Sequence, residues 1–334
     1  MILAVESSCD DTSVALVDMT GALFFHRSLS QNDLHAPYGG VVPELASRTH
    51  SERLPYLVET AFSETGLSLD QVSAAALTVG PGLSGGLLAA ISYLKGLCWA
   101  KNIPMIPVHH IRAHLRVAMD PSLVIPRESL GLVVSGGHTH LYRIREWPDL
   151  DLVGQTTDDA AGEAFDKGAK ALGLPYPGGP EIEKQARLWD GPLLKFVRGI
   201  HTQNPFDFSF SGLKTAFVGQ VRQAGGDHSR IPQFAASYQS AIVAHLVSRI
   251  EKALETFRPP ALLVGGGVAA NEHFRKALEI LCDEGGIPLH IAPRPLCGDN
   301  AVMVALTGLE LFRTGCRVNS PYEEIRPRPR WDED

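Results

Sequence analysis

The chain lacks the cysteine pattern of a disulfide-linked or cysteine-rich zinc protein. It has 334 residues and 5 cysteines, an odd number spread along the sequence without a CxxC pair. A disulfide framework needs an even set of cysteines, and a zinc finger or ribbon needs closely spaced pairs. We therefore expect reduced thiols, and we expect any metal site to use other ligands.

The sequence also lacks long apolar runs. No segment approaches the roughly 20 apolar residues of a membrane-spanning helix, and Glu6 ends the first apolar residues without a preceding basic segment. We expect a cytoplasmic protein with no membrane partner. The length and the hydrophobic content of 44% are sufficient for two domains with cores of their own.

An excess of positive charge is missing as well. The formal net charge is −7, which argues against a broad, non-specific nucleic-acid surface, because phosphate binding needs clustered lysine and arginine. This leaves room for a local basic groove, although solvated surface charge and a frayed terminus are equally good explanations for each candidate. The candidates are Lys95, Lys101, Arg112, Arg116, and Arg326, Arg328 and Arg330 beside Trp331.

The order of the predicted elements indicates two related halves. Periodicity predicts a hairpin over 2–17, helices over 43–65 and 84–101, and strands over 72–79 and 103–108. A similar series follows, with strands over 130–134, 139–144 and 261–264 and helices over 159–172, 232–257 and 271–282. Residues 189–230 indicate irregular surface with a short element over 209–218.

This repetition predicts an α/β fold of the actin-like ATPase architecture, with two related lobes around a central cleft. We expect the first lobe to comprise 1–108 plus 298–334 and the second to comprise 109–297.

His110 and His114 are candidate metal ligands. They follow a predicted strand, and side chains four residues apart project from one face of a helix. Imidazole suits zinc and iron about equally. Such an isolated pair is more often two polar surface histidines, so a third ligand is needed. Asp299, at the start of the last predicted helix, has the right chemistry, but spacing does not show that it is near.

Glycine-rich turns after strands are candidate anion sites, because their backbone N–H groups are accessible. Residues 135–137 lie between two predicted strands, and 265–267 precede a helix whose N-terminus adds partial positive charge. A plain hairpin turn explains the first equally well. The acidic residues Glu6, Asp10 and Asp11 form a turn of the kind that lies beside a nucleotide-bound cation, with solvated turn acids as the alternative.

The segment 158–167 carries more polar side chains than a helix cap needs. Its first residues, Asp158 and Asp159, predict a capped helix start, and further acidic and basic side chains share one helical face. The polar loop 209–214, which ends in Lys214, is a weaker candidate for substrate contact than for a structural loop.

Taken together and in this order, the motifs resemble the universal tRNA threonylcarbamoyladenosine transferase family, the TsaD group. The resemblance runs through almost the whole chain. It is carried by ESSCDDT at 6–12, GGVVPELASR at 39–48, GPGL at 80–83, His109-His110 with His114, VSGGHT at 134–139, 158–167, YPGGP at 176–180, FSFSGLKT at 208–215, 265–271 and Asp299-Asn300.

The resemblance implies the actin-like fold and a defined reaction. The threonylcarbamoyl group of threonylcarbamoyl-AMP is transferred to the exocyclic amine of the adenosine 3′ of the anticodon in tRNAs that read ANN codons. One divalent metal ion, iron or zinc, is assigned to His110, His114 and Asp299. Substrate contacts are assigned to Val133, Val134, Ser135, Gly136, Gly137, Asp166, Gly179, Glu183 and Asn271.

The resemblance also implies partners, and it leaves one role open. The partners are tRNA, a shorter paralogue of the same fold (TsaB-like) and a small P-loop ATPase (TsaE-like). Because the adenine amine is a poor nucleophile, we expect a carboxylate to assist proton removal, with Asp11 as the candidate.

Three residues depart from the family pattern. Asp11 stands where the family usually has Glu, Arg112 where bacterial members often have Glu, and Glu183 where relatives often have Asp. None is an implied metal ligand, so these departures bear on rate, substrate positioning or partner fit rather than on the class of reaction.

Two other functions are compatible with the predicted fold. An actin-like sugar kinase or ATPase needs the nucleotide turns but not the histidine pair. A non-catalytic scaffold paralogue is expected to lack both the histidine pair and the Asp299 motif, which are present here. A protease is not supported, because there is no HExxH motif and no convincing Ser-His-Asp arrangement.

Overall fold

The computed structural model describes residues 1–196, 202–225, 227–319, 322 and 324–331. The chain divides into two compact units, Met1–Val124 with Gly298–Asp334, and Ile125–Cys297. The boundary predicted from the sequence lies after residue 108, whereas the structure places it after Val124. The reason is that helix α4 (His110–Arg116) packs on α10 (Ala301–Arg313) and on β5 (Met105–His109), which both belong to the first unit.

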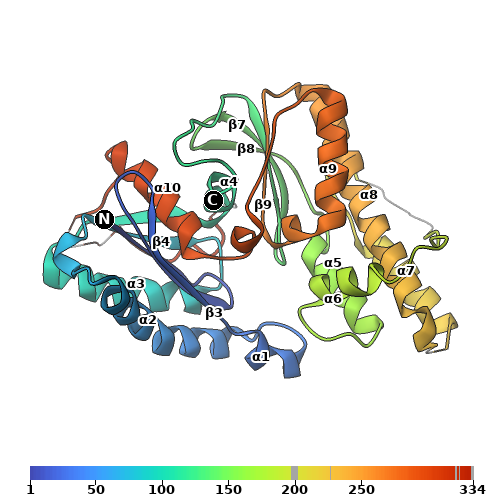
Figure 1. Cartoon of the computed structure of the whole chain (residues 1–334), viewed down its shortest axis with the longest axis horizontal. Coiled ribbons are helices and arrows are strands. Elements are labelled where there is room, and N and C mark those ends of the chain that lie inside the picture. The colour runs from blue at the N-terminus through green and yellow to red at the C-terminus, as the bar shows by residue number, and fades with distance from the viewer. Residues whose placement is uncertain (197–201, 226, 320–321, 323, 332–334) are drawn as a thin grey trace. The chain divides into compact units, whose positions relative to one another are not determined.

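The first unit is built on a mixed sheet whose described strands have the order β3-β2-β1-β4-β5. The first three strands are antiparallel neighbours, and β4 and β5 run parallel to β1. Helices α2 and α3 lie below this sheet in Figure 1 and α10 lies above it. The bounds are β1 Ile2–Glu6, β2 Asp11–Val17, β3 Leu23–Ser30, β4 Ala74–Gly80, α1 Asn32–His35, α2 Pro43–Thr65 and α3 Ser84–Lys101.

The second unit is built on a sheet of the same kind, with the described order β8-β7-β6-β9-β10. Strands β6, β7 and β8 are antiparallel neighbours, and β9 and β10 run parallel to β6. Helix α8 packs on α6 and α9. The bounds are β6 Ser129–Val134, β7 Thr139–Glu146, β8 Asp149–Gln155, β9 Leu262–Gly265, β10 Leu289–Ile291, α5 Ala161–Ala171, α6 Gly178–Ala186, α7 Ser211–Gln223, α8 Ile231–Phe257 and α9 Glu272–Gly285.

The two sheets therefore share one topology, and the predicted repetition is confirmed. In each unit an antiparallel three-stranded meander is extended by two parallel strands that are reached through helices. The central strands read as continuous apolar runs because both of their faces are covered. All five residues of β1 and all six of β6 are buried.

The elements that were not predicted from the sequence are strands at an edge of a sheet or a helix that begins with helix-breaking residues. The third meander strands, β3 and β8, are half exposed and carry no clean alternation. Helix α6 begins with Gly-Gly-Pro, whereas α7 is the short element predicted over 209–218, extended to Gln223. Local sequence is a weak signal for such elements, because tertiary packing rather than propensity holds them.

The prediction that Asp158 and Asp159 cap the start of α5 is wrong. Ala160 occupies the cap position and makes no side-chain cap bond. Asp158 instead accepts hydrogen bonds from the backbone N–H groups of Phe210 (2.7 Å) and Ser211 (3.2 Å), so it caps α7. Asp159 pairs with the ammonium groups of Lys167 and Lys214. The two acidic residues thus connect α7 to α5 rather than starting α5.

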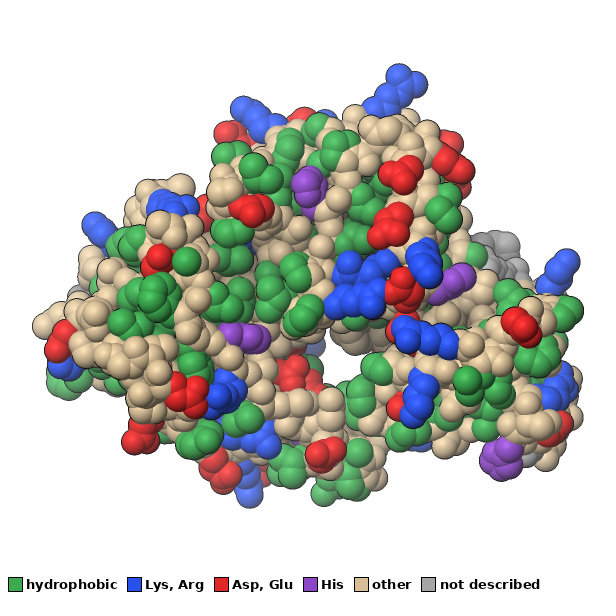
Figure 2. Space-filling view, in the orientation of Figure 1, with side chains coloured by type: hydrophobic (Ala, Val, Ile, Leu, Met, Phe, Trp, Pro, Cys, Tyr) green, Lys and Arg blue, Asp and Glu red, His purple; other side chains and the backbone are tan. Residues whose placement is uncertain are grey.

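Two sequence expectations can be followed on the surface and along the helices. On the face shown in Figure 2, acidic and basic side chains are interspersed in small groups instead of forming one broad basic area. Among the residues that the structure describes, no helix combines the length and the hydropathy needed to cross a bilayer.

Candidate functional site

The histidine pair lies where β5 ends and α4 begins. His109 is the last residue of β5, and His110 and His114 face the same side of α4. Their rings meet edge to face with centroids 4.6 Å apart. His110 is 5% exposed and His114 is fully buried. This burial contradicts the alternative of two polar surface histidines, because burying two imidazoles has a desolvation cost that a surface pair avoids.

Asp299 joins this pair from the other end of the chain. Asn300 caps α10 by accepting a hydrogen bond from the Met303 N–H at 3.0 Å, which leaves Asp299 just outside the helix. Its Oδ1 lies 3.1 Å from Nε2 of His114 and 3.5 Å from Nε2 of His110. One ligand atom from each of the three residues lies within 4.8 Å of the other two.

The donor set fits a divalent transition metal. Two imidazole nitrogens and one carboxylate oxygen converge, which is the ligand class of catalytic zinc sites and of non-haem iron sites with open coordination positions. Buried imidazole favours the neutral, ligating form, and burial lowers the pKa of His114 below its usual range. The set does not discriminate between zinc and iron.

Glu6 contacts the Nδ1 atom of His110, on the side of the ring opposite the proposed metal site. Its carboxylate is fully buried, with Oε2 3.3 Å from Nδ1 of His110, and Oε1 accepts the Ser8 N–H at 2.6 Å. Burial alone would raise the pKa of Glu6, but the charge and hydrogen bond of His110 lower it below the usual value. With Nε2 of His110 turned toward Asp299, Nδ1 can donate to Glu6, the arrangement that orients metal-binding histidines.

Ser8 is a site residue that sequence reasoning missed. Its Oγ lies 3.1 Å from Nδ1 of His110, and it sits in the turn between β1 and β2. Nothing local distinguishes this serine from an ordinary polar turn residue, because its partner is 102 positions away.

Asp10 lies in the turn between β1 and β2, and Asp11 is the first residue of β2. Burial, together with the negative charges of Asp299 and Asp10, raises the pKa of Asp11 to about 7. Burial also raises the pKa of Asp10. The solvated-acid alternative therefore does not describe Asp11, whose carboxyl group is able to exchange a proton near neutral pH.

Replacing Asp11 by Asn in metal-free protein should raise stability above neutral pH. The folded pKa of Asp11 lies above the unfolded value of 3.8, so wild type loses stability as pH rises between those values and bears the full penalty above about 7. We expect the variant to gain about 4 kcal/mol at pH 8 and almost nothing at pH 4, measured by urea unfolding.

Asp18→Asn is the matched control of opposite sign. Hydrogen bonds from the Thr20 side chain and from nearby backbone amides lower the pKa of Asp18, so this variant should lose stability above the folded pKa. A constant gain for Asp11→Asn across the whole pH range would contradict the prediction.

The second unit carries the predicted substrate loop between β6 and β7. The Ser135 N–H donates to the His138 carbonyl oxygen at 2.8 Å, and the His138 N–H donates to Ser135 Oγ at 3.1 Å. Added Cβ atoms at Gly136 and Gly137 would meet nothing within 4 Å. The loop is thus a closed turn whose two glycines present open backbone. Val133 and Val134, which precede it, are fully buried, so their side chains belong to the core.

Glycine is required where other elements approach this loop. The Gly162 N–H donates to the Ser135 carbonyl oxygen at 3.1 Å, and a Cβ there would lie 2.6 Å from that oxygen. Gly266 has φ +93°, and a Cβ there would overlap the backbone of Val134. The start of α5 and the turn after β9 therefore both pack directly on the loop.

The remaining predicted substrate residues lie in or contact the first turns of α6 and α9 in the second unit. Asp166 Oδ1 accepts the Gly178 N–H at 2.7 Å, at the beginning of α6, which also contains Gly179. Glu183 Oε1 accepts the Glu272 N–H at 3.0 Å, next to Asn271.

Asn271 itself is the N-cap of α9. It accepts the Phe274 N–H at 3.0 Å and donates to Gln239 Oε1 at 2.8 Å. The structure thus links Asp166, Glu183 and Asn271 to the first turns of α6 and α9, where backbone N–H groups favour anions. Their contacts with substrate stay predictions.

Similarities to solved structures show which fold the chain has. The chain is similar to the activator of the 2-hydroxyisocaproyl-CoA dehydratase from Clostridium difficile, with a TM-score of 0.55 and 12% identity over 94% of this chain and 96% of that one. It is similar to component A of the (R)-2-hydroxyglutaryl-CoA dehydratase of Acidaminococcus fermentans, with a TM-score of 0.55 and 12% identity over 92% and 97%. Together with the duplicated sheet, these similarities confirm the predicted actin-like ATPase fold.

Similarities in sequence define the family. A model described as tRNA N6-adenosine threonylcarbamoyltransferase (TsaD) matches residues 22–306. Relatives of that name are 42% identical in Chelativorans sp. over 100% of this chain and 95% of the relative, and 43% identical in Moorella thermoacetica over 91% and 89%. A third, from Geobacter sulfurreducens, is 41% identical over 97% of both chains. The chain belongs to the tRNA N6-adenosine threonylcarbamoyltransferase family, and it is a transferase that acts on tRNA.

Proposed function

We propose that this transferase works with one divalent metal ion, iron or zinc, bound by His110, His114 and Asp299. The observation that carries the proposal is the convergence of these three side chains in a buried site. When bound, the metal polarises the carbonyl oxygen of the threonylcarbamoyl group, which supplies several kcal/mol of stabilisation to the developing charge.

The other steps belong to the chain's own residues. The adenine N6 forms a bond to the threonylcarbamoyl carbonyl carbon, and the bond from that carbon to the AMP oxygen breaks. Asp11 accepts the amine proton. Burial and the charges of Asp299 and Asp10 raise its pKa to about 7 in the metal-free protein, and the carboxyl group would be more fully ionised at neutral pH with a cation at Asp299.

Residues of the second unit hold the adenylate in this proposal. Gly136 and Gly137 are exposed, and in this proposal their backbone N–H groups bind the substrate's oxygen atoms, while Ser135 shapes the turn. Gly179 lies in the first turn of α6 and Asn271 caps α9, and the carboxylates of Asp166 and Glu183 bind the first N–H groups of these two helices. In this proposal the four residues contact the nucleotide. Val133 and Val134 contribute through their main chain, because their side chains are buried. Fixing both reactants removes an entropic barrier.

We further propose the target base and the partners from family membership. The target is the adenosine 3′ of the anticodon in tRNAs that read ANN codons, and leaving the anticodon-loop stack requires less energy than leaving a duplex. The protein works in the cytoplasm with a shorter paralogue of the same fold and a small P-loop ATPase. Threonylcarbamoyl-AMP is the co-substrate, and a separate synthase makes it.

A reconstituted transfer assay tests the metal proposal. Labelled threonine, ATP, bicarbonate, the synthase, the partners and tRNA are incubated with protein that has been stripped of metal by a chelator. We expect no label in tRNA until Fe²⁺ or Zn²⁺ is restored. Full transfer by protein shown to be metal-free would reject the metal role, while ATP turnover or sugar phosphorylation without tRNA labelling would favour a kinase-like activity.

A further inference from the structure

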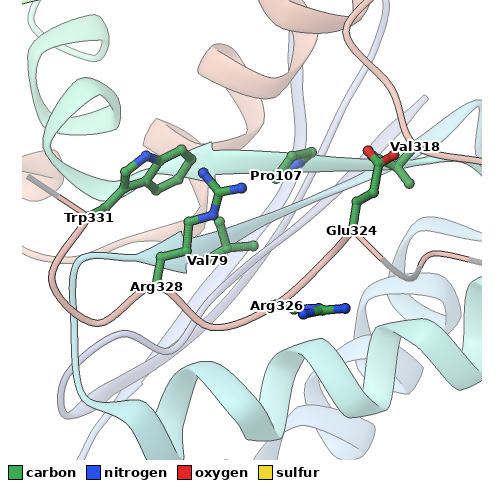
Figure 3. A pocket seen from close by; sticks show the side chains of 7 residues that line it. All are labelled: Val79, Pro107, Val318, Glu324, Arg326, Arg328 and Trp331. Carbon is green, nitrogen blue, oxygen red and sulfur yellow. The ribbon is translucent and has the colours of Figure 1, made fainter. Parts of the chain in front are cut away.

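The C-terminal segment 324–331, here called the C-terminal strap, is tied to the sheet of the first unit. The Arg328 N–H donates to the Val79 carbonyl oxygen at 2.7 Å, and the Pro329 carbonyl oxygen accepts the Gly82 N–H at 3.2 Å. Ile325 at its beginning is 1% exposed. Over these residues the chain is therefore anchored rather than frayed, and Figure 3 shows it running beside the strand that carries Pro107, from Glu324 to Trp331.

Trp331 places the strap in contact with His109, the residue before α4. Its ring lies 4.7 Å from the ring of His109, at an interplanar angle of 46°. His109 is 5% exposed, ends β5 and directly precedes the proposed ligand His110. The Arg328 guanidinium lies 4.7 Å from the centroid of Trp331, a distance at which cation–π attraction holds the indole in place.

A second set of contacts leads from the strap to the same ligand. The strap's hydrogen bond to Gly82 holds the turn after β4, where a Cβ at Gly82 would lie 2.7 Å from the Ser8 Cβ. The Leu83 N–H donates to the Ser8 carbonyl oxygen at 2.7 Å, and Ser8 Oγ lies 3.1 Å from Nδ1 of His110. His110 is thus approached from the strap through His109 on one side and through Ser8 on the other.

The strap packs on the core of the first unit through a few side chains: Ile325 belongs to that core, and Trp331 packs against it. Between the strap and the strands lies a pocket of about 100 Å³ (Figure 3). Its lining residues are Val79, Pro107, Val318, Glu324, Arg326, Arg328 and Trp331. Contact is therefore concentrated at a few side chains, and loss of one indole should leave the sheet folded.

We propose that Trp331 is a positioning residue for the metal centre, which sets the entry of His110 into α4 by packing on His109. The inference rests on the proposed metal site. Groups that orient a first ligand commonly change metal affinity by roughly 10-fold to 100-fold when they are removed. The function of Trp331 is thus exerted on affinity and ligand geometry, not on the transferred group.

Metal titration of the full-length chain tests this role. Metal-free wild type, Trp331→Ala and Trp331→Phe are titrated with Zn²⁺ against a chromophoric chelator, and the ligand-field absorption of the Co²⁺ forms is recorded. We expect Trp331→Ala to weaken Zn²⁺ binding about 10-fold and to alter the Co²⁺ spectrum, while Trp331→Phe retains most of the affinity. Hydrogen exchange of the α4 amides should be faster in Trp331→Ala, with the remaining sheet unchanged.

The controls separate this inference from the metal proposal itself. Trp99, on α3 in the same unit, is 70% exposed, so Trp99→Ala should bind Zn²⁺ as wild type does. Arg328→Gln, which keeps the indole but removes its cation, should have an intermediate effect. Unchanged affinity in Trp331→Ala and Arg328→Gln would overturn the positioning role. If wild type and His110→Ala bind Zn²⁺ equally weakly, the metal proposal fails instead.

Discussion

His110→Ala is expected to abolish threonylcarbamoyl transfer while the protein stays folded. The substitution removes one of the two imidazole ligands and leaves Glu6 without the partner that lowers its pKa. Loss of metal polarisation, worth several kcal/mol, corresponds to a fall in rate of roughly 10³-fold or more. Label transfer to tRNA and the metal content of the purified variant measure the two effects in parallel.

Two further substitutions, one at another proposed ligand and one at a histidine outside the site, test whether the effect is specific. Asp299→Ala removes a ligand from the other end of the chain and should match His110→Ala in both rate and metal content. His290, a half-buried histidine of β10 in the second unit, serves as the control, and His290→Ala should transfer normally. Retained activity with native metal content in His110→Ala would rule out the proposed ligand set.

Gly266→Ala should be among the most destabilising single substitutions in the second unit. The residue has φ +93°, where alanine is strained, and the added methyl group would overlap the backbone of Val134. Strain at positive φ and displacement of a buried strand together should lower the free energy of unfolding by about 3 kcal/mol or more. Chemical denaturation monitored by circular dichroism measures this loss.

Gly267→Ala provides a matched control one residue away. A Cβ at Gly267 would meet nothing within 4 Å, so we expect a change in stability within about 0.5 kcal/mol, as for an ordinary surface position. Equal destabilisation by the two substitutions would show that the close approach to Val134 is not what requires glycine at 266.

The duplicated topology explains where the candidate residues occur. The turn between the first two strands carries Ser8 and the acidic residues in the first unit, and the equivalent turn in the second unit carries the Ser135 loop. The turn after the fourth strand is glycine-rich in both units, at Gly80 and at Gly266. One architectural position thus carries polar and acidic side chains in one unit and exposed glycine backbone in the other.

The first hairpin and four helices show how much of the fold the local sequence pattern predicts. The hairpin over β1 and β2 and the helices α2, α3, α8 and α9 were predicted within a few residues, because long periodic segments identify the buried face. β3 and α6 were not predicted. An exposed edge strand and a helix that begins with glycine and proline acquire their structure from neighbours, which a local pattern does not record.

By itself the sequence determined the family, the repeated fold and the identity of the candidate ligands, since ordered motifs and periodicity are properties of the chain. Only the tertiary structure decided that His110 and His114 are buried and that Asp299, 185 positions from His114, lies 3.1 Å from it. The same holds for Glu6 and Ser8 behind His110, and for Trp331 against His109. Burial and the meeting of distant residues depend on how strands and helices pack, and no spacing along one chain specifies that packing.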